Sequence, residues 1–522
     1  MKYPIGIQNF ERIRREGYAY VDKTAIVWKL VNDGSYYFLS RPRRFGKSLL
    51  LSTIEAYMEG KRELFEGLAI AGLEREWKRY PILHLDLNAK QYNDKSDLLK
   101  ILNMHLERWE GIYGDKYKDR DPEERFMHVI EQAYEKTGMP VVILVDEYDK
   151  PMLHKLGTPE VRPFRDALKR FYSVIKTCEG LQRFALVTGI SKFSKVSIFS
   201  DLNNLTDVTM MPRYATLLGY TRAEVEANFS EHVAELGRGL GLSPEEAMAR
   251  IVHWYDGYRF APRSEARVCN PVSLGNAFKF GELKGYWEMT GRATLVINRI
   301  KKSGKLPEDL ENVPADAFML DVCDAESLPM EALLYQGGYL TIKDVKRGDP
   351  KKDETDKYVL APPNFEVRAA LKRGYLAQVM GLDEDPFNTL VDRAKRQIAS
   401  GDIADVVETM LFSLYAQIPP DWRIKDEAEA KRYFQLFFAM LGSNPAPEFP
   451  SARGYADAVV ERPSAVYVFE FKYDESSEAA IRQIRERGYA DKWIGGARPV
   501  TLVGINFNPK KRNIDIPVIE QA

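Results

Sequence analysis

Residues 36–48 read Tyr36-Tyr37-Phe38-Leu39-Ser40-Arg41-Pro42-Arg43-Arg44-Phe45-Gly46-Lys47-Ser48. The apolar start has the composition of a buried strand, and the helix-like stretch Ser48–Met58 follows. A strand, a turn and a helix N-terminus together aim backbone N–H groups at a phosphate, while a lysine meets the β/γ oxygens and a hydroxyl reaches Mg²⁺. We therefore predict an ATP site contacted by Arg43, Arg44, Gly46, Lys47 and Ser48, with Ser48 also a ligand of Mg²⁺.

The loop departs from the phosphate-loop pattern G-x-x-x-x-G-K-[ST] at its first position, where Arg41 replaces glycine. Arginine has fewer backbone conformations than glycine, so the loop is expected to take a different shape. Arg41, Arg43 and Arg44 either contact phosphate, in this chain or in trans, or form a solvated basic loop. The sequence leaves both alternatives open.

A second apolar run ends in two acids, in Val141-Val142-Ile143-Leu144-Val145-Asp146-Glu147. A carboxylate at the end of a strand can hold Mg²⁺, and the next acid can orient or deprotonate an attacking water. We predict Asp146 as a metal ligand and Glu147 as a catalytic residue. Ligands of open α/β sheets gather at strand ends, so Thr188, at the end of the following run, is predicted near the γ-phosphate, with a simple turn as the alternative.

Strand-like and helix-like stretches alternate through the first half of the chain. The strand-like runs are Tyr36–Ser40, Pro81–Leu87, Val141–Val145 and Arg183–Thr188, and the helix-like stretches are Ser48–Met58, Leu98–Trp109 and Glu123–Glu135. This alternation predicts an α/β fold with a parallel sheet. From Thr221 the chain is predicted to be mainly helical, with helices over Thr221–Gly237 and Ser243–His253. Thr221 and Ser243 are their predicted N-cap residues, because a glutamate follows each of them three positions later. A short β element near Tyr339–Val345 and an exposed loop or wing at Lys346–Lys357 follow.

The C-terminal part returns to strands after a helical block, Pro386–Leu441. Strands are predicted at Tyr455–Val460, Ala465–Tyr473 and Pro499–Ile505, with a helix near Glu478–Trp493. Side chains alternate along a strand, so Glu470 and Lys472 share one face, and a hairpin can bring Asp457 beside them. Two carboxylates can then hold Mg²⁺ while Lys472 positions the water that attacks a phosphodiester. The alternative is a hairpin with an outward Glu–Lys ion pair.

Two further features of this region stay open at the level of the sequence. An upstream acid, Glu429 or Glu448, is a candidate to complete the metal site. Arg482, Arg485, Arg487 and Lys492 either contact phosphate or form a solvated helix face.

Composition limits the classes of partner. The 522 residues suggest several domains, and 75 Lys and Arg against 76 Asp and Glu favour neither nucleic acid nor membrane through net charge. The longest apolar runs are strand-length, so no membrane span is expected. Three separated cysteines, Cys178, Cys269 and Cys323, show no disulfide or metal spacing, which is typical of a reducing cytoplasm.

Several motifs together resemble the bacterial AAA-ATPase-like family with a C-terminal PD-(D/E)XK nuclease-superfamily domain. They are Tyr20-Val21-Asp22-Lys23-Thr24, Arg43-Arg44-Phe45-Gly46-Lys47-Ser48, Val145-Asp146-Glu147-Tyr148-Asp149, Phe199-Ser200-Asp201-Leu202-Asn203-Asn204-Leu205-Thr206-Asp207, Trp254-Tyr255-Asp256-Gly257-Tyr258 and Tyr335-Gln336-Gly337-Gly338-Tyr339-Leu340. The family shares the arginine at the first glycine position. The resemblance implies an additional-strand P-loop core over 1–215, a helical and winged-helix-like region over 216–385, and a helical linker with a restriction-endonuclease-like domain over 386–522. It also implies that Gln483 belongs to the nuclease site.

These features predict an ATPase coupled to a Mg²⁺-dependent nuclease that acts on nucleic acid, with DNA as the expected substrate. Catalytic residues are expected at Glu147, Asp457, Glu470, Lys472 and Gln483, and Mg²⁺ ligands at Ser48, Asp146, Asp457 and Glu470. A homo-oligomer is compatible with this interpretation. The alternative is a nucleotide-controlled module that binds nucleic acid or protein through an inactive nuclease fold.

Overall fold

The computed structural model describes residues 2–88, 91–115, 117–153, 155, 158–192, 198–199, 204–287, 294–321, 329–352, 354–379, 382, 384–400, 403–417, 424, 426–440, 446–451 and 454–522. The chain forms two compact units. The N-terminal unit contains Met1–Arg292 and Asp309–Arg368, and the C-terminal unit contains Ala293–Glu308 and Ala369–Ala522. The chain therefore passes between the units after Arg292, after Glu308 and after Arg368. The three domains expected from the sequence, 1–215, 216–385 and 386–522, stay a prediction.

A parallel sheet forms the centre of the N-terminal unit, and its described strands run in the order β2-β3-β4-β1-β5. Strand β4 lies between β1 and β3, so the additional strand implied by the family resemblance is confirmed. The four strands predicted from the sequence are also confirmed, within one residue at each end. The apolar runs of β1 and β3 are buried on both faces, as is typical of a parallel sheet, whereas β2 at the edge is buried on one face. The strands are β1 (Tyr36–Ser40), β2 (Ile82–Asp86), β3 (Val141–Asp146), β4 (Gln182–Gly189) and β5 (Thr206–Asp207).

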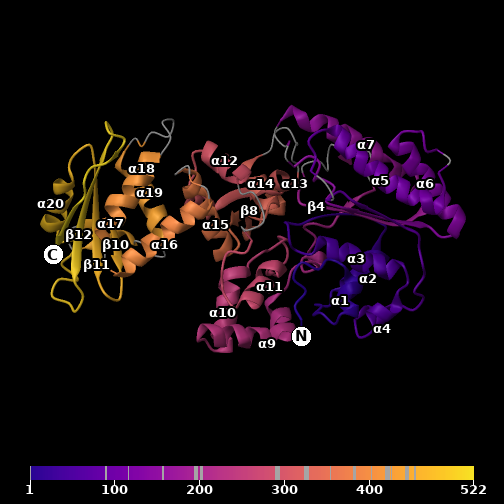
Figure 1. The fold of residues 1–522 in the computed structure, drawn as a ribbon, viewed down its shortest axis with the longest axis horizontal. Coiled ribbons are helices and arrows are strands. Elements are labelled where there is room, and N and C mark those ends of the chain that lie inside the picture. Colours follow the sequence, from indigo (N-terminus) through magenta and orange to yellow (C-terminus); the bar gives the residue numbers. More distant parts are fainter. Residues whose placement is uncertain are drawn as a thin grey trace. The chain divides into compact units, whose positions relative to one another are not determined.

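Helices cover both faces of this sheet (Figure 1). One face carries α1 (Phe10–Arg15), α2 (Thr24–Asp33), α3 (Lys47–Met58) and α4 (Ile70–Leu73), and the other carries α5 (Lys95–Tyr113), α6 (Pro122–Thr137) and α7 (Arg162–Thr177). The three helices predicted in this region lie within α3, α5 and α6. Short 3-10 turns lie at Arg62–Phe65, Pro159–Val161, Glu179–Leu181, Pro212–Tyr214, Pro307–Leu310 and Pro350–Lys352.

The helical region of the N-terminal unit begins as the sequence predicts. The helices are α9 (Arg222–Leu240), α10 (Pro244–Tyr255) and α11 (Pro271–Phe280). In α9 the Thr221 side chain accepts from the Glu224 N–H while the Glu224 carboxylate accepts from the Thr221 N–H, and Ser243 with Glu246 does the same in α10. These capping boxes satisfy N–H groups that a helix start otherwise leaves unpaired.

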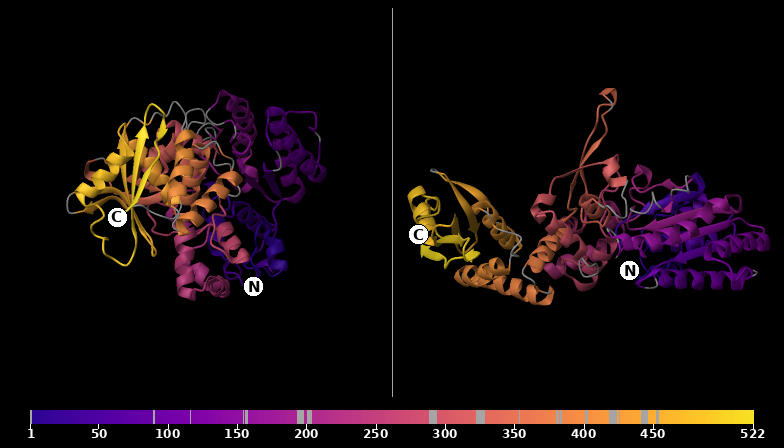
Figure 2. Two further views of the ribbon diagram at one scale, coloured as in Figure 1. Left: turned by 60° about the vertical axis from the view of Figure 1, so that its left-hand side comes forward. Right: turned by 90° about the horizontal axis from the view of Figure 1, so that it is seen from above.

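A small antiparallel sheet completes the described part of this unit, with strand order β6-β8-β7. Its strands are β6 (Val313–Asp316), β7 (Thr341–Lys346) and β8 (Lys357–Ala361), and α13 (Ala317–Asp321) and α14 (Met330–Gln336) precede the hairpin. This order of helices and strands is that of the predicted winged-helix-like element. The predicted loop Lys346–Lys357 joins β7 to β8, and their hairpin projects from the unit in the right-hand view of Figure 2.

The C-terminal unit combines helices with a mixed sheet. Its helices are α12 (Thr294–Lys302), most of α15 (Phe365–Val379), α16 (Glu384–Ser400), α17 (Ile403–Asp405), a π-helical turn at Val406–Leu411, α18 (Phe412–Gln417) and α19 (Glu427–Met440). The segment that includes α12 is tied to α15, because Gln378 donates to Asn298 and Lys372 lies 3.1 Å from Glu308.

The mixed sheet runs β13-β12-β11-β10-β9, and β14 also pairs with β12. Strand β11 is parallel to β12 through the crossover helix α20 (Ser477–Arg487), and the other described pairs are antiparallel. One face packs on α20 around Val466 and Val468, while Phe469 and Phe471 meet Phe434 of α19 on the other. The strands are β9 (Ala446–Ser451), β10 (Gly454–Glu461), β11 (Val466–Tyr473), β12 (Val500–Asn508), β13 (Asn513–Ile514) and β14 (Val518–Gln521).

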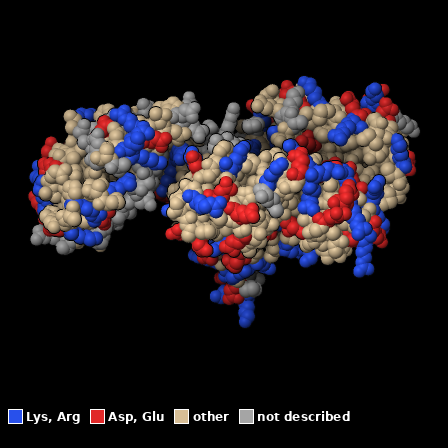
Figure 3. All heavy atoms as spheres, turned by 60° about the horizontal axis from the view of Figure 1, so that its bottom comes forward, with Lys and Arg blue, Asp and Glu red and all other residues tan. Residues whose placement is uncertain are grey.

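Charged side chains of both signs are interspersed over the face drawn in Figure 3. This distribution agrees with the near-zero net charge of the sequence. Any contact with a polyanion must therefore come from local groups of residues, as the composition predicts.

Candidate functional site

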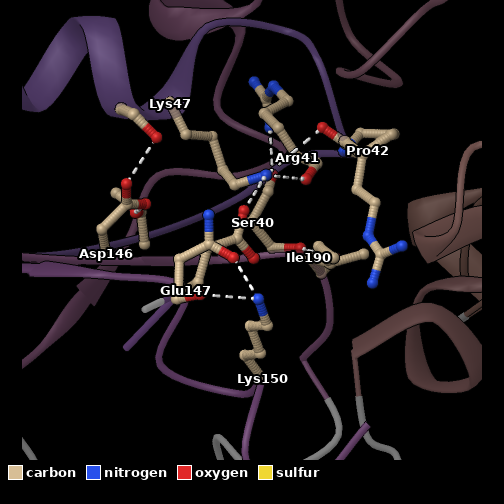
Figure 4. A network of polar contacts seen from close by, with 12 residues as sticks. Ser40, Arg41, Pro42, Lys47, Asp146, Glu147, Lys150 and Ile190 are labelled. Carbon is tan, nitrogen blue, oxygen red and sulfur yellow. Dashed lines mark hydrogen bonds and ion pairs between the residues drawn. The ribbon is translucent and has the colours of Figure 1, made fainter. Parts of the chain in front are cut away.

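The loop between β1 and α3 carries the predicted phosphate-binding residues. Gly46 is the N-cap of α3 with a φ of 97°, a left-handed conformation that glycine adopts without strain. The chain thereby turns into the first turn of α3, whose unpaired N–H groups attract anions. Lys47 is only 4% exposed, and its Nζ lies 3.1 Å from the carbonyl oxygen of Arg41 and 3.4 Å from that of Pro42 (Figure 4). The amino group of Lys47 therefore binds the backbone at the start of the same loop.

Three elements converge on Asp146 at the end of β3. Its Oδ2 accepts a hydrogen bond from Ser48 Oγ at 2.5 Å, and its Oδ1 accepts one from Thr188 Oγ1 at 2.9 Å. The structure thus brings together the hydroxyl of α3 and the carboxylate of β3 that the sequence assigns to one Mg²⁺. Thr188 is buried at the end of β4 and orients Asp146, a role that neither alternative for this residue anticipates.

Glu147 follows directly with a φ of 53°, an uncommon conformation for a residue with a side chain. Its Oε1 lies 3.3 Å from Nζ of Lys47, and both side chains are largely buried. Backbone strain of this kind, about 1–3 kcal/mol, is concentrated at functional sites. The predicted catalytic acid therefore lies against the predicted phosphate-binding lysine.

Arg41 does not project toward the phosphate position. Its side chain is 1% exposed, its Nη1 donates to the carbonyl oxygens of Ser40 and Thr209 at 2.9 and 2.7 Å, and its guanidinium stacks 4.3 Å from the ring centre of Phe260. Burial lowers the pKa of Arg41 to about 10. Neither phosphate contact nor a solvated loop, the two alternatives left open for Arg41, describes this residue, because backbone carbonyls and an aromatic ring bind its buried guanidinium.

The other two arginines of the loop differ in environment. Arg43 is exposed, whereas Arg44 is half-buried, has a φ of 70° and donates to the carbonyl oxygen of Tyr286 at 3.5 Å. Burial, with a smaller contribution from Arg43, lowers the pKa of Arg44. Contact of either side chain with ATP stays a prediction.

Asp149 and Tyr148 hold the turn after β4, a role that the sequence analysis does not assign. The Asp149 carboxylate accepts from the backbone N–H of Ile190 at 3.2 Å and from the N–H and hydroxyl of Ser191 at 2.7 and 2.5 Å. The Tyr148 hydroxyl donates to the carbonyl oxygen of Ser191 at 2.9 Å. Burial, with Glu147 adding to it, raises the pKa of Asp149 to about 6. The feature of the sequence that could have indicated this role is the third acid, Asp149, in Asp146-Glu147-Tyr148-Asp149.

The motif around Gln336 packs against the same site. Its Oε1 accepts from the backbone N–H of Lys192 at 2.7 Å. A Cβ added at Gly338 would lie 2.7 Å from Cβ of Pro42 in the phosphate loop. Glycine at position 338 therefore permits a close approach that a side chain would block. Within the motif that starts at Phe199, residues 200–203 lie outside the described part of the chain.

A buried acid, Glu366, lies beside Arg44 at the start of α15. Its Oε1 accepts from the backbone N–H of Tyr286 at 2.6 Å and of Trp287 at 2.7 Å, and the side chain is 1% exposed. Burial raises the pKa of Glu366 to about 7, although these hydrogen bonds oppose the shift. No pattern in the sequence indicates this site, because its partners lie about 80 positions away.

Glu366 is expected to make stability depend on pH. Its pKa of about 7 in the folded protein lies above the ordinary value of 4.5, so protonation stabilises the folded state fully below about pH 4.5. This contribution, about 3 kcal/mol, is lost as the pH rises through about 7. Glu366→Gln stays neutral and should flatten the free energy of unfolding, measured by urea denaturation, between pH 5 and 8. An unchanged slope would contradict this assignment.

The second predicted site lies where β10 and β11 run side by side. The paired part of these strands ends with Ala458 opposite Phe469, and Asp457 and Glu470 come directly after this pair on the two strands. Asp457 Oδ2 accepts from the Phe471 N–H at 2.7 Å. The hairpin predicted from the sequence therefore brings the two carboxylates together.

Glu470 is held from two sides. Lys472 Nζ lies 3.1 Å from its Oε1 and also donates to the Phe471 carbonyl oxygen at 3.0 Å, and Gln483 of α20 donates to the same Oε1. Glu470 and Lys472 are 1% and 9% exposed, so the alternative of an outward ion pair is wrong. Burial raises the pKa of Glu470 to about 7, with Asp457 adding to this effect.

The second oxygen of Glu470, Oε2, is buried without a hydrogen-bond partner among the described residues. An unsatisfied carboxylate oxygen in such a place is costly unless a donor or a cation meets it. Carboxylate oxygens are the ligands that Mg²⁺ prefers in proteins. Asp457 and Glu470 therefore fit a divalent cation.

Helix α19 contributes two residues that the sequence analysis does not identify. Lys431 Nζ lies 2.5 Å from Asp457 Oδ1 and 2.5 Å from Glu427 Oε1. Glu427 and Lys431 are four positions apart, and this spacing is the feature of the sequence that could have predicted their ion pair on one helix face. Glu429 lies on the same helix and stays a prediction as the upstream acid. Glu448 lies in β9, and its side chain is outside the described part.

The basic residues near this site have mixed environments. Arg485 pairs with Glu520 at 2.7 Å, and Lys492 Nζ lies 5.1 Å from the ring centre of Trp493. These contacts agree with a helix face at the surface, and phosphate contact by Arg482, Arg485, Arg487 or Lys492 stays a prediction.

The described ranges contain no group of three or more His, Cys, Asp or Glu arranged to hold a metal. Cys178 and Cys269 are buried free thiols, and Cys323 lies outside the described residues. No helix in the described ranges has both the length and the apolar composition that crossing a bilayer requires.

Comparison with known proteins matches the two sites to two families. Residues 4–199 match the family described as Predicted AAA-ATPase, and residues 425–516 match the PD-(D/E)XK nuclease superfamily. A relative named as an uncharacterized protein in the vnfD 5' region of Azotobacter chroococcum mcd 1 is 36% identical over 531 residues, which cover 99% of each chain. The chain belongs to the AAA-ATPase-like family.

The matched ranges of this AAA-ATPase-like protein contain the two sites described above. Lys47, Asp146 and Thr188 lie in the first range, and Asp457 and Glu470 lie in the second. The family suspected from the sequence motifs is therefore confirmed, as is the combination of an ATPase-like core with a nuclease-like domain. Such domains generally use a nucleotide and a divalent metal.

Proposed function

We propose that the protein binds and hydrolyses ATP in its N-terminal unit and cleaves phosphodiester bonds of nucleic acid, with DNA as the substrate, in its C-terminal unit. The observation that carries this proposal is the buried Oε2 of Glu470, which is unpartnered among the described residues and lies in a site with Asp457 and Lys472. In a hairpin with only a structural role, such a buried oxygen without a partner would be destabilising.

In the ATPase unit, Lys47 and the first turn of α3 would bind the β- and γ-phosphates. Ser48 and Asp146 would hold Mg²⁺, and Thr188 fixes the carboxylate in the required orientation. Glu147 would accept a proton from the attacking water or orient it, after its contact with Lys47 is released.

In the nuclease unit, Asp457 and Glu470 would hold the metal ion. A bound Mg²⁺ supplies positive charge for the phosphate and acidifies a bound water. Lys472 lies beside Glu470 and would stabilise negative charge at the scissile phosphate, while Gln483 holds Glu470 in place. ATP would control the cleavage, and assembly into a homo-oligomer is part of the proposal.

The proposal is tested with purified protein, plasmid and single-stranded DNA, Mg²⁺ or Mn²⁺, and ATP present or absent. We expect cleavage, and we expect Lys47→Ala to reduce ATP hydrolysis about 100-fold, because it removes the cation that meets the phosphates. Phosphate release measures hydrolysis, and fluorescent ATP measures binding. Lys29→Ala, at an exposed position of α2, is the matched control.

The outcomes separate the proposal from its main alternative. Wild-type hydrolysis in Lys47→Ala would remove this loop from the ATPase mechanism. Nucleic-acid binding without cleavage under any condition would instead support a nucleotide-controlled binding module with an inactive nuclease fold.

A further inference from the structure

We infer that Lys431 is the resident counter-ion of the nuclease site: it occupies the metal-facing oxygen of Asp457 in the metal-free protein, and a divalent cation must displace it to bind. This inference rests on the proposed metal site. It assigns to Lys431 and Glu427 the control of when that site takes up its metal.

The first step concerns the lone pairs of Asp457. Its Oδ2 is bound by the Phe471 N–H at 2.7 Å, which fixes the carboxylate to β11. Its Oδ1 is bound by Lys431 Nζ at 2.5 Å. Oδ1 is thus the oxygen that the Phe471 N–H does not bind, and Lys431 binds it. A metal ion that binds Asp457 through Oδ1 therefore competes with the ammonium group of Lys431.

The second step concerns charge. Lys472 Nζ lies 3.1 Å from Glu470 Oε1, and Lys431 Nζ lies 2.5 Å from both Asp457 Oδ1 and Glu427 Oε1. Three carboxylates therefore face two ammonium groups, and little negative charge is left uncompensated without a metal. A divalent ion added to this set would leave one uncompensated positive charge, and repulsion between cations within a few ångströms is strong in a partly buried site. One ammonium group must leave.

The third step identifies which one leaves. Lys472 also donates to the Phe471 carbonyl oxygen and is 9% exposed, so its position is fixed within the sheet. The Lys431 side chain is 22% exposed and already bridges Asp457 to Glu427, whose side chain is 36% exposed. A flexible lysine can pivot from Asp457 toward Glu427, which lies one helical turn away and nearer the solvent. Glu427 is therefore the acceptor that makes displacement possible.

The test measures Mn²⁺ affinity by calorimetry on the full-length protein without nucleotide, with the site defined as the binding signal that Glu470→Ala removes. Lys431→Met should bind Mn²⁺ about tenfold more tightly, because the competing cation is gone. Glu427→Gln should bind it more weakly, because Lys431 then has only Asp457 as its partner. Lys510→Met, at an exposed position after β12, should bind like the wild type.

A thermal-shift measurement supports the same test and checks folding. Lys431→Met leaves Asp457 without its counter-ion, so we expect a lower melting temperature without metal and a larger upward shift with Mn²⁺ than in the wild type. Equal or weaker Mn²⁺ affinity in a folded Lys431→Met would overturn the inference, and so would tighter binding in Glu427→Gln. Absence of a Glu470-dependent signal from the wild type and from Lys431→Met alike would overturn the metal site itself, and with it the proposed nuclease.

Discussion

Glu470→Ala is expected to reduce metal-dependent DNA cleavage at least about a thousandfold while ATP binding stays at the wild-type level. The substitution removes the buried carboxylate whose Oε2 is unpartnered among the described residues, and it also removes the partner of Lys472 and Gln483. Some loss of stability is expected, because the buried Lys472 keeps its hydrogen bond to the Phe471 carbonyl oxygen but loses its acidic partner. Loss of linear product in a gel assay, with fluorescent ATP as the second readout, measures both effects.

The matched control for this experiment is Glu461→Ala. Glu461 lies at the far end of β10, outside the site, and pairs with Arg498 at 2.8 Å. This variant removes an acid from the same strand without touching Asp457 or Glu470, and it should cleave like the wild type. Cleavage that persists in Glu470→Ala would show that the activity arises elsewhere or from a contaminant.

Arg41→Gly is expected to destabilise the protein by about 3 kcal/mol, although it restores the glycine of the common phosphate-loop pattern. Charge-assisted hydrogen bonds from the guanidinium to the carbonyl oxygens of Ser40 and Thr209 would be lost, together with stacking on Phe260. The carbonyl of Thr209 would be left in a buried space without this donor, and a cavity would remain. Glycine also increases the entropy of the unfolded chain.

Urea denaturation measures this effect, with Arg43→Gly as the control in the same loop. Arg43 is exposed, so its replacement should change the free energy of unfolding by at most about 1 kcal/mol. Equal losses in the two variants would show that the loop backbone, and not the buried guanidinium, determines the stability. ATP affinity, measured where both variants are folded, then shows whether the loop shape depends on Arg41.

The sequence predicts the fold well where the signal is local. The apolar run Val141–Val145 and the cap residues Thr221 and Ser243 each specify their element through neighbours a few positions away, and all of these predictions are confirmed. The closeness of Asp457 and Glu470 follows from one hairpin, so the sequence predicts it equally well.

Contacts between distant segments are not predicted, and for this reason neither alternative left open for Arg41 describes its buried position. Whether a loop arginine faces a phosphate or the interior depends on Thr209 and Phe260, more than 160 positions away along the chain. Lys431 reaches Asp457 from a different helix for the same reason. A periodic pattern predicts on which face of an element a side chain lies, but it does not predict which charged residue the neighbouring element places opposite that side chain.

The path of the chain between the two units has a consequence for protein synthesis. The segment that includes α12 leaves the ribosome before β7 and β8, yet its partners Gln378 and Lys372 follow Arg368. The N-terminal unit cannot complete its folding until Arg368 has left the ribosome, and the segment that includes α12 lacks these partners at least until then. A fragment that starts at Ala369 would likewise lack Asn298 and Glu308. Expression of the nuclease unit alone therefore requires the early segment to be supplied, either as a fusion ahead of Ala369 or as a second chain.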